Sequence, residues 1–270
     1  MKYYIVSDIH GYCDYLIRDL LKEGYERENQ NHTLIVLGDI LDRGTQPKET
    51  LDFLMAVPKD NLIMVKGNHE YLLENLLKKK EINRVDIING TASTLFNLLD
   101  YNYIEGNPFK CRKFRKSVKS NVYLKWLKNY KFKNFYKLGN YIFVHSFIPL
   151  YNKTPFTMYH LYGEYKRNLE YIPNWDTVKL DKQTWEESTW GCPYMLFKDG
   201  FFKEESKKGN VLVCGHWRTS DFFRAYKKEI SNDIFYSPHL IAIDGNTPIS
   251  EKVNVLVLEE KDGKVVVVKK

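Results

Sequence analysis

Carboxylate, imidazole and amide side chains recur in this sequence directly after short apolar runs. They stand at Asp8, His10, Asp39, Asp42, Asn68, His69, His145 and His216. Imidazole and carboxylate ligands without thiolates suit manganese, iron or zinc, whereas structural zinc sites are usually rich in cysteine. The set is too large for one tetrahedral ion. It favours two metal ions about 3.5–4 Å apart, which activate water for in-line attack on a phosphoryl group.

The apolar runs predict buried β-strands at 3–6, 33–37, 62–65, 141–144, 211–214 and 240–243. Helices are expected at 15–24 and 47–56, and this βαβαβα order predicts parallel strands joined by right-handed crossovers. The carboxyl ends of parallel strands meet at one edge of a sheet, where ligand sites form. A lone aspartate before a helix is more often a cap. Recurrence of polar groups after five strands therefore favours a shared site.

The remainder of the chain predicts a single domain spanning 1–270. A basic, mostly helical segment is expected over about 71–137, with breaks at Gly90 and Pro108. A variable segment over about 149–208 shows weak periodicity and is expected to form loops and helices on the substrate side. The tail predicts a hairpin of 253–258 with 265–268.

Composition narrows the class of protein. The 270 residues are 43% hydrophobic, which is enough for a substantial core. The four cysteines are widely separated, and no signal peptide or membrane-spanning run is evident, so we expect a reduced, cytoplasmic protein without membrane contact. No P-loop, GxGxxG or GxSxG motif is present, which leaves nucleotide-binding loops and serine hydrolase elbows without support.

Positive charge is concentrated in one stretch. Residues 106–163 contain twelve Lys and Arg but no Asp or Glu, and aromatic residues are interleaved with them. This pattern is compatible with a nucleic-acid interface. An ordinary basic surface is favoured instead, because apolar residues at helical spacing leave Lys125 and Lys128 on a solvated face. Such a surface would attract anionic substrates.

Three motifs resemble, in order and spacing, the signature of the calcineurin-like metallophosphoesterases. They are Asp8-Ile9-His10-Gly11, Gly38-Asp39-Ile40-Leu41-Asp42-Arg43-Gly44 and Gly67-Asn68-His69-Glu70. Within that superfamily the chain looks most like the phosphoprotein phosphatase branch, which includes bacterial and phage serine/threonine phosphatases. The resemblance implies an α/β four-layer sandwich with central mixed β-sheets flanked by helices. It also implies a dimetal site at the carboxyl ends of the strands.

The resemblance further implies a role for each matching residue. Asp8 and His10 would bind the first metal, Asp39 would bridge, and Asn68, His145 and His216 would bind the second. His69 would be the general acid, oriented and kept protonated by Asp42, while Arg43 would hold the substrate phosphate. The nucleophile would be a metal-bridging hydroxide, without a covalent phosphoenzyme. Manganese is the expected divalent metal, with iron, zinc, nickel or cobalt as alternatives.

The sequence departs from its relatives near the substrate. Lys66 stands where an arginine is common, and it is a candidate substrate-binding residue without the planar fork of arginine. The family's further phosphate-binding arginine has no match at 190–192, which leaves Arg167 and Arg218 as candidates. Other departures are Ser146 after His145 and Trp217 after His216.

The function expected from these features is hydrolysis of phosphomonoesters, with phosphorylated protein or a small phosphoester as substrate. A serine/threonine-type protein phosphatase is the leading hypothesis. A symmetrical bis(5'-nucleosyl)-tetraphosphatase is the alternative, although Glu70 stands where those hydrolases usually carry Asp. A non-catalytic nucleic-acid or partner-binding module is a third hypothesis, which the complete ligand set disfavours. The oligomeric state is left open.

Overall fold

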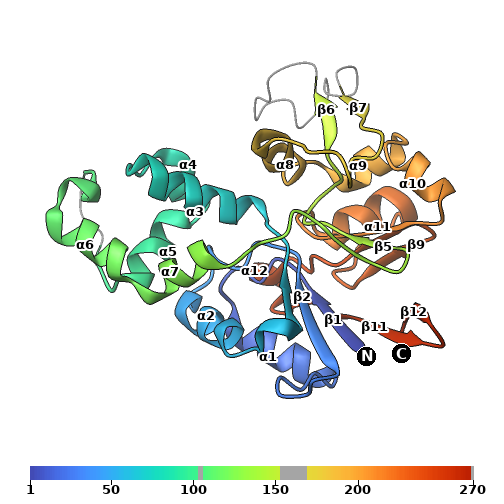
Figure 1. Cartoon of the computed structure of the whole chain (residues 1–270), viewed down its shortest axis with the longest axis horizontal. Coiled ribbons are helices and arrows are strands. Elements are labelled where there is room, and N and C mark those ends of the chain that lie inside the picture. Colours follow the sequence, from blue (N-terminus) through green and yellow to red (C-terminus); the bar gives the residue numbers. More distant parts are fainter. Residues whose placement is uncertain (103–105, 153–168, 269–270) are drawn as a thin grey trace.

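Two five-stranded mixed β-sheets form the centre of the computed structural model, which describes residues 1–102, 106–152 and 169–268 (Figure 1). The strands of the first sheet are, in spatial order, β12 (Lys264–Val267), β11 (Leu256–Lys261), β1 (Lys2–Val6), β2 (His32–Val36) and β3 (Leu62–Met64). Those of the second are β4 (Tyr136–Leu138), β5 (Tyr141–Phe143), β8 (Val211–Cys214), β10 (Leu240–Ala242) and β9 (Phe235–Ser237).

The first sheet confirms the expected parallel strands. β1, β2 and β3 pair in parallel, with Val6 opposite Val36 and Val36 opposite Met64, so their carboxyl ends reach the same edge. Every residue of β2 is buried, as expected for a strand covered on both faces. β11 and β12 form the expected C-terminal hairpin, and β11 pairs antiparallel with β1.

The second sheet contains two edge strands that the apolar runs did not predict. Its parallel centre, β5–β8–β10, matches three predicted strands. β4 and β9 pair antiparallel at its two edges and have only three residues each. β4 overlaps the C-terminal end of the stretch 71–137, which was expected to be mostly helical. That expectation is wrong for its last residues. A strand this short and partly exposed carries too few alternating residues to give a clear period of two.

Helices cover the outer faces of both sheets. Beside the first sheet lie α1 (Cys13–Lys22) and α2 (Pro47–Met55). A helical group extends to the left of them in Figure 1 and contains α3 (Asn68–Lys79), α4 (Arg84–Ile88), α5 (Thr91–Leu98), α6 (Arg112–Ser120) and α7 (Val122–Asn129). On the second side lie α8 (Lys182–Ser188), α9 (Pro193–Lys198), α10 (Lys203–Lys207) and α11 (Thr219–Lys227). The described part of 71–137 contains the helices α3 to α7; α5 follows Gly90, and a short 3-10 turn begins at Pro108.

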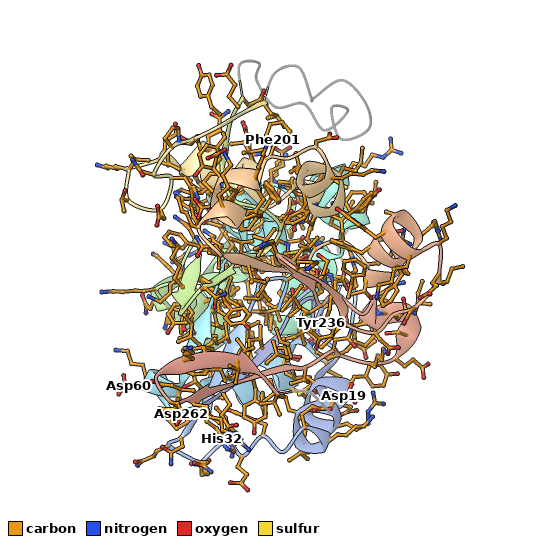
Figure 2. The ribbon with its side chains drawn as sticks, turned by 90° about the vertical axis from the view of Figure 1, so that its right-hand side faces the viewer. Asp19, His32, Asp60, Phe201, Tyr236 and Asp262 are labelled. Carbon is orange, nitrogen blue, oxygen red and sulfur yellow. The ribbon has the colours of Figure 1, made fainter. Side chains whose placement is uncertain are left out.

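Three apolar clusters hold the layers together. One cluster, which includes Ile5, Phe143 and Ile241, lies between the two sheets, and the others fill the spaces under the helices. Figure 2 shows the layers from the side, with Asp19 of α1 and Phe201 at opposite ends and Tyr236 of β9 between them. The predicted α/β sandwich with mixed sheets flanked by helices is confirmed.

The segment over 149–208 contains helices, as expected, and also a strand pair. β6 (Leu150–Asn152) and β7 (Leu169–Tyr171) pair antiparallel outside the two main sheets. The short helix α12 (Thr247–Ser250) follows β10. Within the described ranges, no helix is both long and apolar enough to cross a membrane.

Candidate metal centre

The predicted polar side chains gather where the carboxyl ends of β1, β2 and β3 approach those of β5 and β8. Seven of them are at most 2% exposed: Asp8, His10, Asp39, Asp42, Asn68, His69 and His145. His216, directly after β8, is partly buried. The strand register explains the gathering, because each side chain follows its strand by only a few residues. The two sheets therefore contribute to one site.

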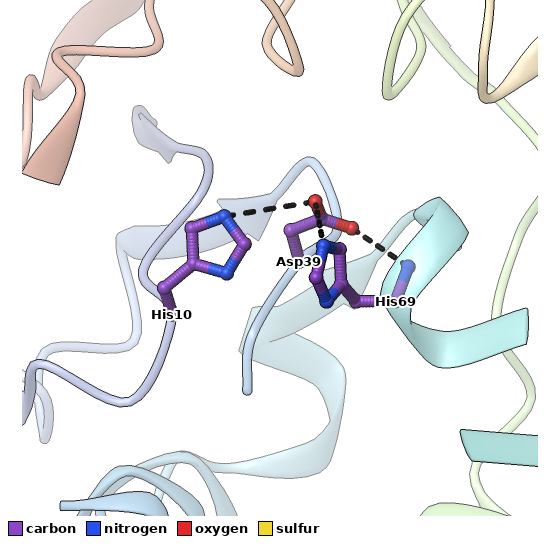
Figure 3. A group of neighbouring side chains, drawn as sticks. All are labelled: His10, Asp39 and His69. Atoms are coloured by element: carbon purple, nitrogen blue, oxygen red, sulfur yellow. Dashed lines mark hydrogen bonds and ion pairs between the residues drawn. The ribbon is translucent and has the colours of Figure 1, made fainter. Parts of the chain in front are cut away.

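Asp39 lies at the centre of this cluster (Figure 3). Its Oδ2 is 3.7 Å from His10 Nε2 and 3.7 Å from His69 Nε2, and its Oδ1 is 3.4 Å from His145 Nε2. Two sets have ligand atoms within 4.8 Å of one another, namely Asp39 with His10 and His69, and Asp39 with His145 and His216. Because Asp39 belongs to both sets, one carboxylate could contact two ions.

Hydrogen bonds to backbone carbonyls fix two of the imidazole rings. His10 Nδ1 lies 3.0 Å from the carbonyl oxygen of Leu41, and His145 Nδ1 lies 2.6 Å from that of Leu37. A carbonyl oxygen only accepts, so each Nδ1 carries a hydrogen and each Nε2 presents its lone pair to the site. This is the usual arrangement of metal-binding histidines.

The electrostatics of the cluster favour bound cations. Burial raises the pKa of Asp8 and Asp39 well above the ordinary value, because their charged forms lose hydration. Burial also lowers the pKa of His10 and His216, which keeps these rings neutral. Among the described residues, the positive charge of Arg43 acts on the Asp39 carboxylate, and burial and neighbouring carboxylates oppose its ionisation. Divalent ions would supply the missing charge.

The position of the Asn68 side chain is also compatible with a bound metal ion. Its Oδ1 lies 2.7 Å from His145 Nε2, where the ring already presents a lone pair. Two acceptor atoms this close repel each other unless the ring is protonated, a cation lies between them or the amide is turned. Metal ligands at about 2.0–2.2 Å from a shared ion come naturally into such proximity. The residues present thus fit a pair of divalent metals.

Asp8 is oriented by two donors. Ser7 Oγ and the backbone N–H of His216 both donate to Asp8 Oδ2, the latter at 2.9 Å, while Oδ1 lies 4.0 Å from His10 Nε2. The bond from His216 ties the end of β8 to the end of β1, and therefore one sheet to the other.

His69, Asp42 and Arg43 form a second group at the edge of the metal cluster. His69 Nδ1 lies 2.7 Å from Asp42 Oδ2, and Arg43 Nη2 lies 3.3 Å from His69 Nε2. Thr91 Oγ1 also donates to Asp42 Oδ2 at 2.6 Å. Burial raises the pKa of Asp42 to about 6, although hydrogen bonds from Thr91 and Thr94 act in the opposite direction.

The protonation of His69 differs from the expectation in this structure. Burial lowers its pKa well below the ordinary value, and the positive charge of Arg43 lowers it further. Both effects act against the raising effect expected from Asp42. A bound phosphate dianion would favour the protonated ring, because opposite charge raises the pKa of histidine.

The loops that carry these side chains are held in an unusual backbone conformation. Six residues of the site have positive φ: Asp8, His10, Asp39, Asp42, Arg43 and His216. Non-glycine residues rarely adopt this region, and clusters of them mark functional sites whose surroundings enforce the strain. Glu70 provides part of that enforcement. Its carboxylate accepts from the backbone N–H groups of Asp39 and Ile40, each at 2.9 Å, and of Gly67 at 2.7 Å.

Three residues were candidates for binding the substrate: Lys66, Arg218 and Arg167. Lys66 pairs with Glu74 and lies 4.0 Å from the ring centre of Tyr71. Arg218 donates to Asp221 and lines a cavity of about 370 Å³ together with Arg43 and His216. Arg167 lies outside the described residues.

Asp244 is a site residue that received no role from the sequence. It follows β10, is 5% exposed and lines the same cavity as Arg43 and His216. The signal was available, since the apolar run 240–243 ends directly at this carboxylate. The Asp244 carboxylate accepts a hydrogen bond from the backbone N–H of Asn246 at 2.7 Å. Its negative charge raises the pKa of Asp8 and is the second cause of that shift, after burial.

The sandwich and its shared-carboxylate cluster define a class of metal-dependent phosphoesterases. A sequence model described as "Calcineurin-like phosphoesterase" matches residues 1–243. The chain belongs to this family, which confirms the family resemblance of the three motifs.

Two curated relatives match parts of the chain. The asymmetrical bis(5'-nucleosyl)-tetraphosphatase PrpE of Bacillus velezensis is 35% identical over 105 residues, which are 36% of this chain and 41% of that protein. The symmetrical bis(5'-nucleosyl)-tetraphosphatase of Pseudomonas syringae pv. syringae is 34% identical over 82 residues, which are 30% and 27% of the two chains. The chain therefore matches less than half the length of either relative.

Solved structures share the architecture along the whole chain. A cold-active protein-tyrosine phosphatase of a psychrophilic Shewanella species aligns with a TM-score of 0.56 at 16% identity, over 99% of this chain and 80% of that one. A protein serine/threonine phosphatase from Saccharomyces cerevisiae aligns with a TM-score of 0.53 at 12% identity, over 99% and 79%. At such identities these likenesses describe the fold alone.

Proposed function

We propose that this chain is a dimetal phosphoesterase that hydrolyses phosphomonoesters, with phosphorylated protein side chains as the leading substrate class. The observation that carries the proposal is the position of Asp39, whose Oδ2 faces His10 and whose Oδ1 faces His145. A carboxylate shared in this way suits two metals acting on one phosphoryl group. Manganese is the proposed metal, and iron, zinc, nickel or cobalt are alternatives.

The metal pair, when bound, would polarise the phosphoryl group and supply an activated water. Arg43 is proposed to hold the phosphate oxygens through its planar fork of donors, because its guanidinium lies beside both His10 and His69. His69 is proposed to take a proton on Nε2 as phosphate binds and to deliver it to the leaving oxygen. Asp42 fixes the orientation of the ring through Nδ1–H.

A dinucleoside tetraphosphate is the second candidate substrate. Two curated relatives with that printed activity, one asymmetrical and one symmetrical, match 105 and 82 residues of this chain. The matches cover only about a third of this chain, so the printed activity of these relatives is a candidate and not the leading proposal. The binding-module hypothesis has less support, because it gives no reason for the buried carboxylates to surround neutral imidazoles.

The test is a side-by-side assay of the manganese-loaded protein. We expect hydrolysis of p-nitrophenyl phosphate, and faster hydrolysis of a phosphoserine peptide than of diadenosine tetraphosphate at equal concentration. Faster cleavage of the dinucleotide would replace the leading substrate class with the second. Failure to hydrolyse any of the three, with two metals bound per chain, would refute the proposed function.

A further inference from the structure

A groove of about 1230 Å³ opens beside His69 and Asp42 and runs away from the metal centre. Its walls come from α3, α6, α7 and the region of α8; Figure 1 shows α3, α6 and α7 at the left and α8 apart from them near the top. We call it the lysine groove, after the lysines on its walls. The basic stretch noted in the sequence therefore supplies part of a channel that begins at the catalytic group.

The positive charge of the lysine groove is largely uncompensated. Lys66 and Lys182 both pair with Glu74, the latter at 2.7 Å. Five other lining lysines are exposed and make no ion pair with an acidic side chain in the described part of the chain: Lys78, Lys119, Lys125, Lys128 and Lys131. The remaining acidic groups of the groove are engaged, since Asp42 bonds His69 and Glu70 binds backbone N–H groups. A polyanionic ligand complements this surface.

The size of the lysine groove indicates an extended ligand. Pockets for drug-sized molecules occupy about 300–1,000 Å³. The volume of about 1230 Å³ exceeds what a single phosphorylated amino acid would fill. The ligand would therefore be a chain that places its phosphate at the metal centre and continues past α3 and α7.

The aromatic rings of the groove are engaged in packing, which disfavours a nucleic acid. Tyr130 packs against Trp126 and Phe132, with ring centres 5.5 and 5.1 Å apart. Trp185 stacks on Phe135 at 5.6 Å and is 8% exposed. Proteins that bind single strands present open aromatic faces for base stacking. The groove instead combines lysines with partly buried aliphatic side chains, a surface suited to a peptide.

We propose that the lysine groove binds acidic residues that flank the phosphorylated side chain of a peptide substrate. The proposal rests on the proposed phosphatase function and assigns its sequence preference. Carboxylates along the peptide would meet the unpaired lysines and increase the local substrate concentration at the metal centre. Lys125 and Lys128 of α7 are the positions where this contribution is easiest to isolate, because both are exposed and without an ion-pair partner in the described residues.

The experiment compares peptides that share one phosphoserine and differ in their flanks, acidic in one and neutral in the other. At low salt the wild-type protein is expected to prefer the acidic peptide by roughly tenfold in kcat/KM, an effect of electrostatic attraction. The preference should shrink at 0.5 M salt, because exposed charges are then screened. In Lys125→Glu/Lys128→Glu the ratio of the two kcat/KM values should fall to about one.

The matched control is Lys22→Glu/Lys264→Glu, which makes the same change in net charge at exposed lysines outside the groove. It should retain the wild-type preference. Circular dichroism and metal content verify that both variants are folded. An equal preference in the wild type, or an unchanged preference in the groove variant, would overturn the proposal.

A binding measurement separates this inference from the proposed function. Fluorescence anisotropy with a non-hydrolysable phosphonate peptide requires no turnover, so it tests the groove even if the protein fails to hydrolyse p-nitrophenyl phosphate. Acidic flanks should tighten binding to the wild type and not to the groove variant. If a single-stranded RNA bound through the same lysines and the acidic peptide did not, the occupant would be a nucleic acid and the proposal would be wrong.

Discussion

Asp39 is the central carboxylate of the candidate metal site and lies near three of its histidines. It approaches His10, His69 and His145 with its two oxygens, and its Oδ1 also accepts from the backbone N–H of His69 at 3.0 Å. Burial raises the free energy of the ionised Asp39 carboxylate, and bound cations would offset this cost. The same carboxylate therefore links the metal centre to the start of α3.

Asp39→Asn is expected to remove both metal binding and activity. The amide is isosteric but neutral, so it cannot balance two divalent ions. We expect kcat/KM to fall by at least about 100-fold, with metal content below the wild-type value by elemental analysis. Unchanged metal content would contradict the bridging role.

His69→Asn is expected to separate catalysis from metal binding. The variant cannot deliver a proton to the leaving oxygen, so kcat should fall by roughly 10²–10⁴. Metal content should stay at the wild-type value, because His69 is not among the proposed ligands. A substrate with a good leaving group, such as p-nitrophenyl phosphate, should lose less than a phosphoserine peptide. Loss of metal in this variant would assign His69 to the coordination sphere instead.

At the scale of elements, the loop after β2 and the start of α3 behave as one unit. Glu70 in the first turn of α3 joins them by three hydrogen bonds to backbone N–H groups. The close approach requires a glycine at 67, because a Cβ there would overlap Asp39 Oδ1. Glu70 therefore caps α3 through the N–H of Gly67 and also holds the backbone of Asp39 and Ile40.

Glu70→Ala is expected to loosen this unit without touching a metal ligand. Backbone N–H groups would lose their acceptor in a partly buried place, at a cost of about 1–3 kcal/mol in the free energy of unfolding. Metal affinity should fall with it, because Asp39 would no longer be held. Denaturant unfolding and metal titration measure the two effects. Glu74→Ala on the same helix is the control, and it should change stability by only about 0–1 kcal/mol because the Glu74 carboxylate is exposed to solvent.

At the scale of the molecule, the metal centre exists only because two sheets meet. Asp8, Asp39 and Asn68 come from the first sheet, whereas His145 and His216 come from the second. Gly215 lies at the junction, where a Cβ would overlap Ser7 and Asp8. The site therefore depends on the packing of the apolar cluster between the sheets.

Gly215→Ala is expected to disturb this junction. The added methyl should cost about 1–3 kcal/mol as overpacking and displace Asp8 from its donors. We expect a lower melting temperature and reduced metal content. Gly200→Ala is the matched control, because a Cβ there meets no atom within 4 Å although φ is +87°. The control should lose about 1–2 kcal/mol, because alanine there would adopt a left-handed conformation, and it should keep its metals. Equal metal content in both variants would contradict the role of Gly215.

The local sequence determined the strands of the parallel centres and the polar residues at their ends. Apolar runs such as 33–37 and 211–214 are strong signals, since a buried parallel strand requires continuous apolar residues. A glycine followed by Asp39 or His216 marks the point where the strand stops and a loop must bend sharply. These features depend on neighbouring residues alone, so a single sequence contains them.

The tertiary structure decided which of these groups meet and what surrounds them. The resemblance implied a bridging Asp39, but the sequence does not indicate that burial opposes the protonation of His69 or that Asp244 lines the cavity. The short edge strands β4 and β9 were also not predicted from the sequence. The basic stretch within 106–163 was related to the site only by the folded structure, in which α3, α6 and α7 line one groove that reaches His69. Contacts between distant segments have no periodic signature in the chain, because they arise from the packing of two sheets and their helices around a common core.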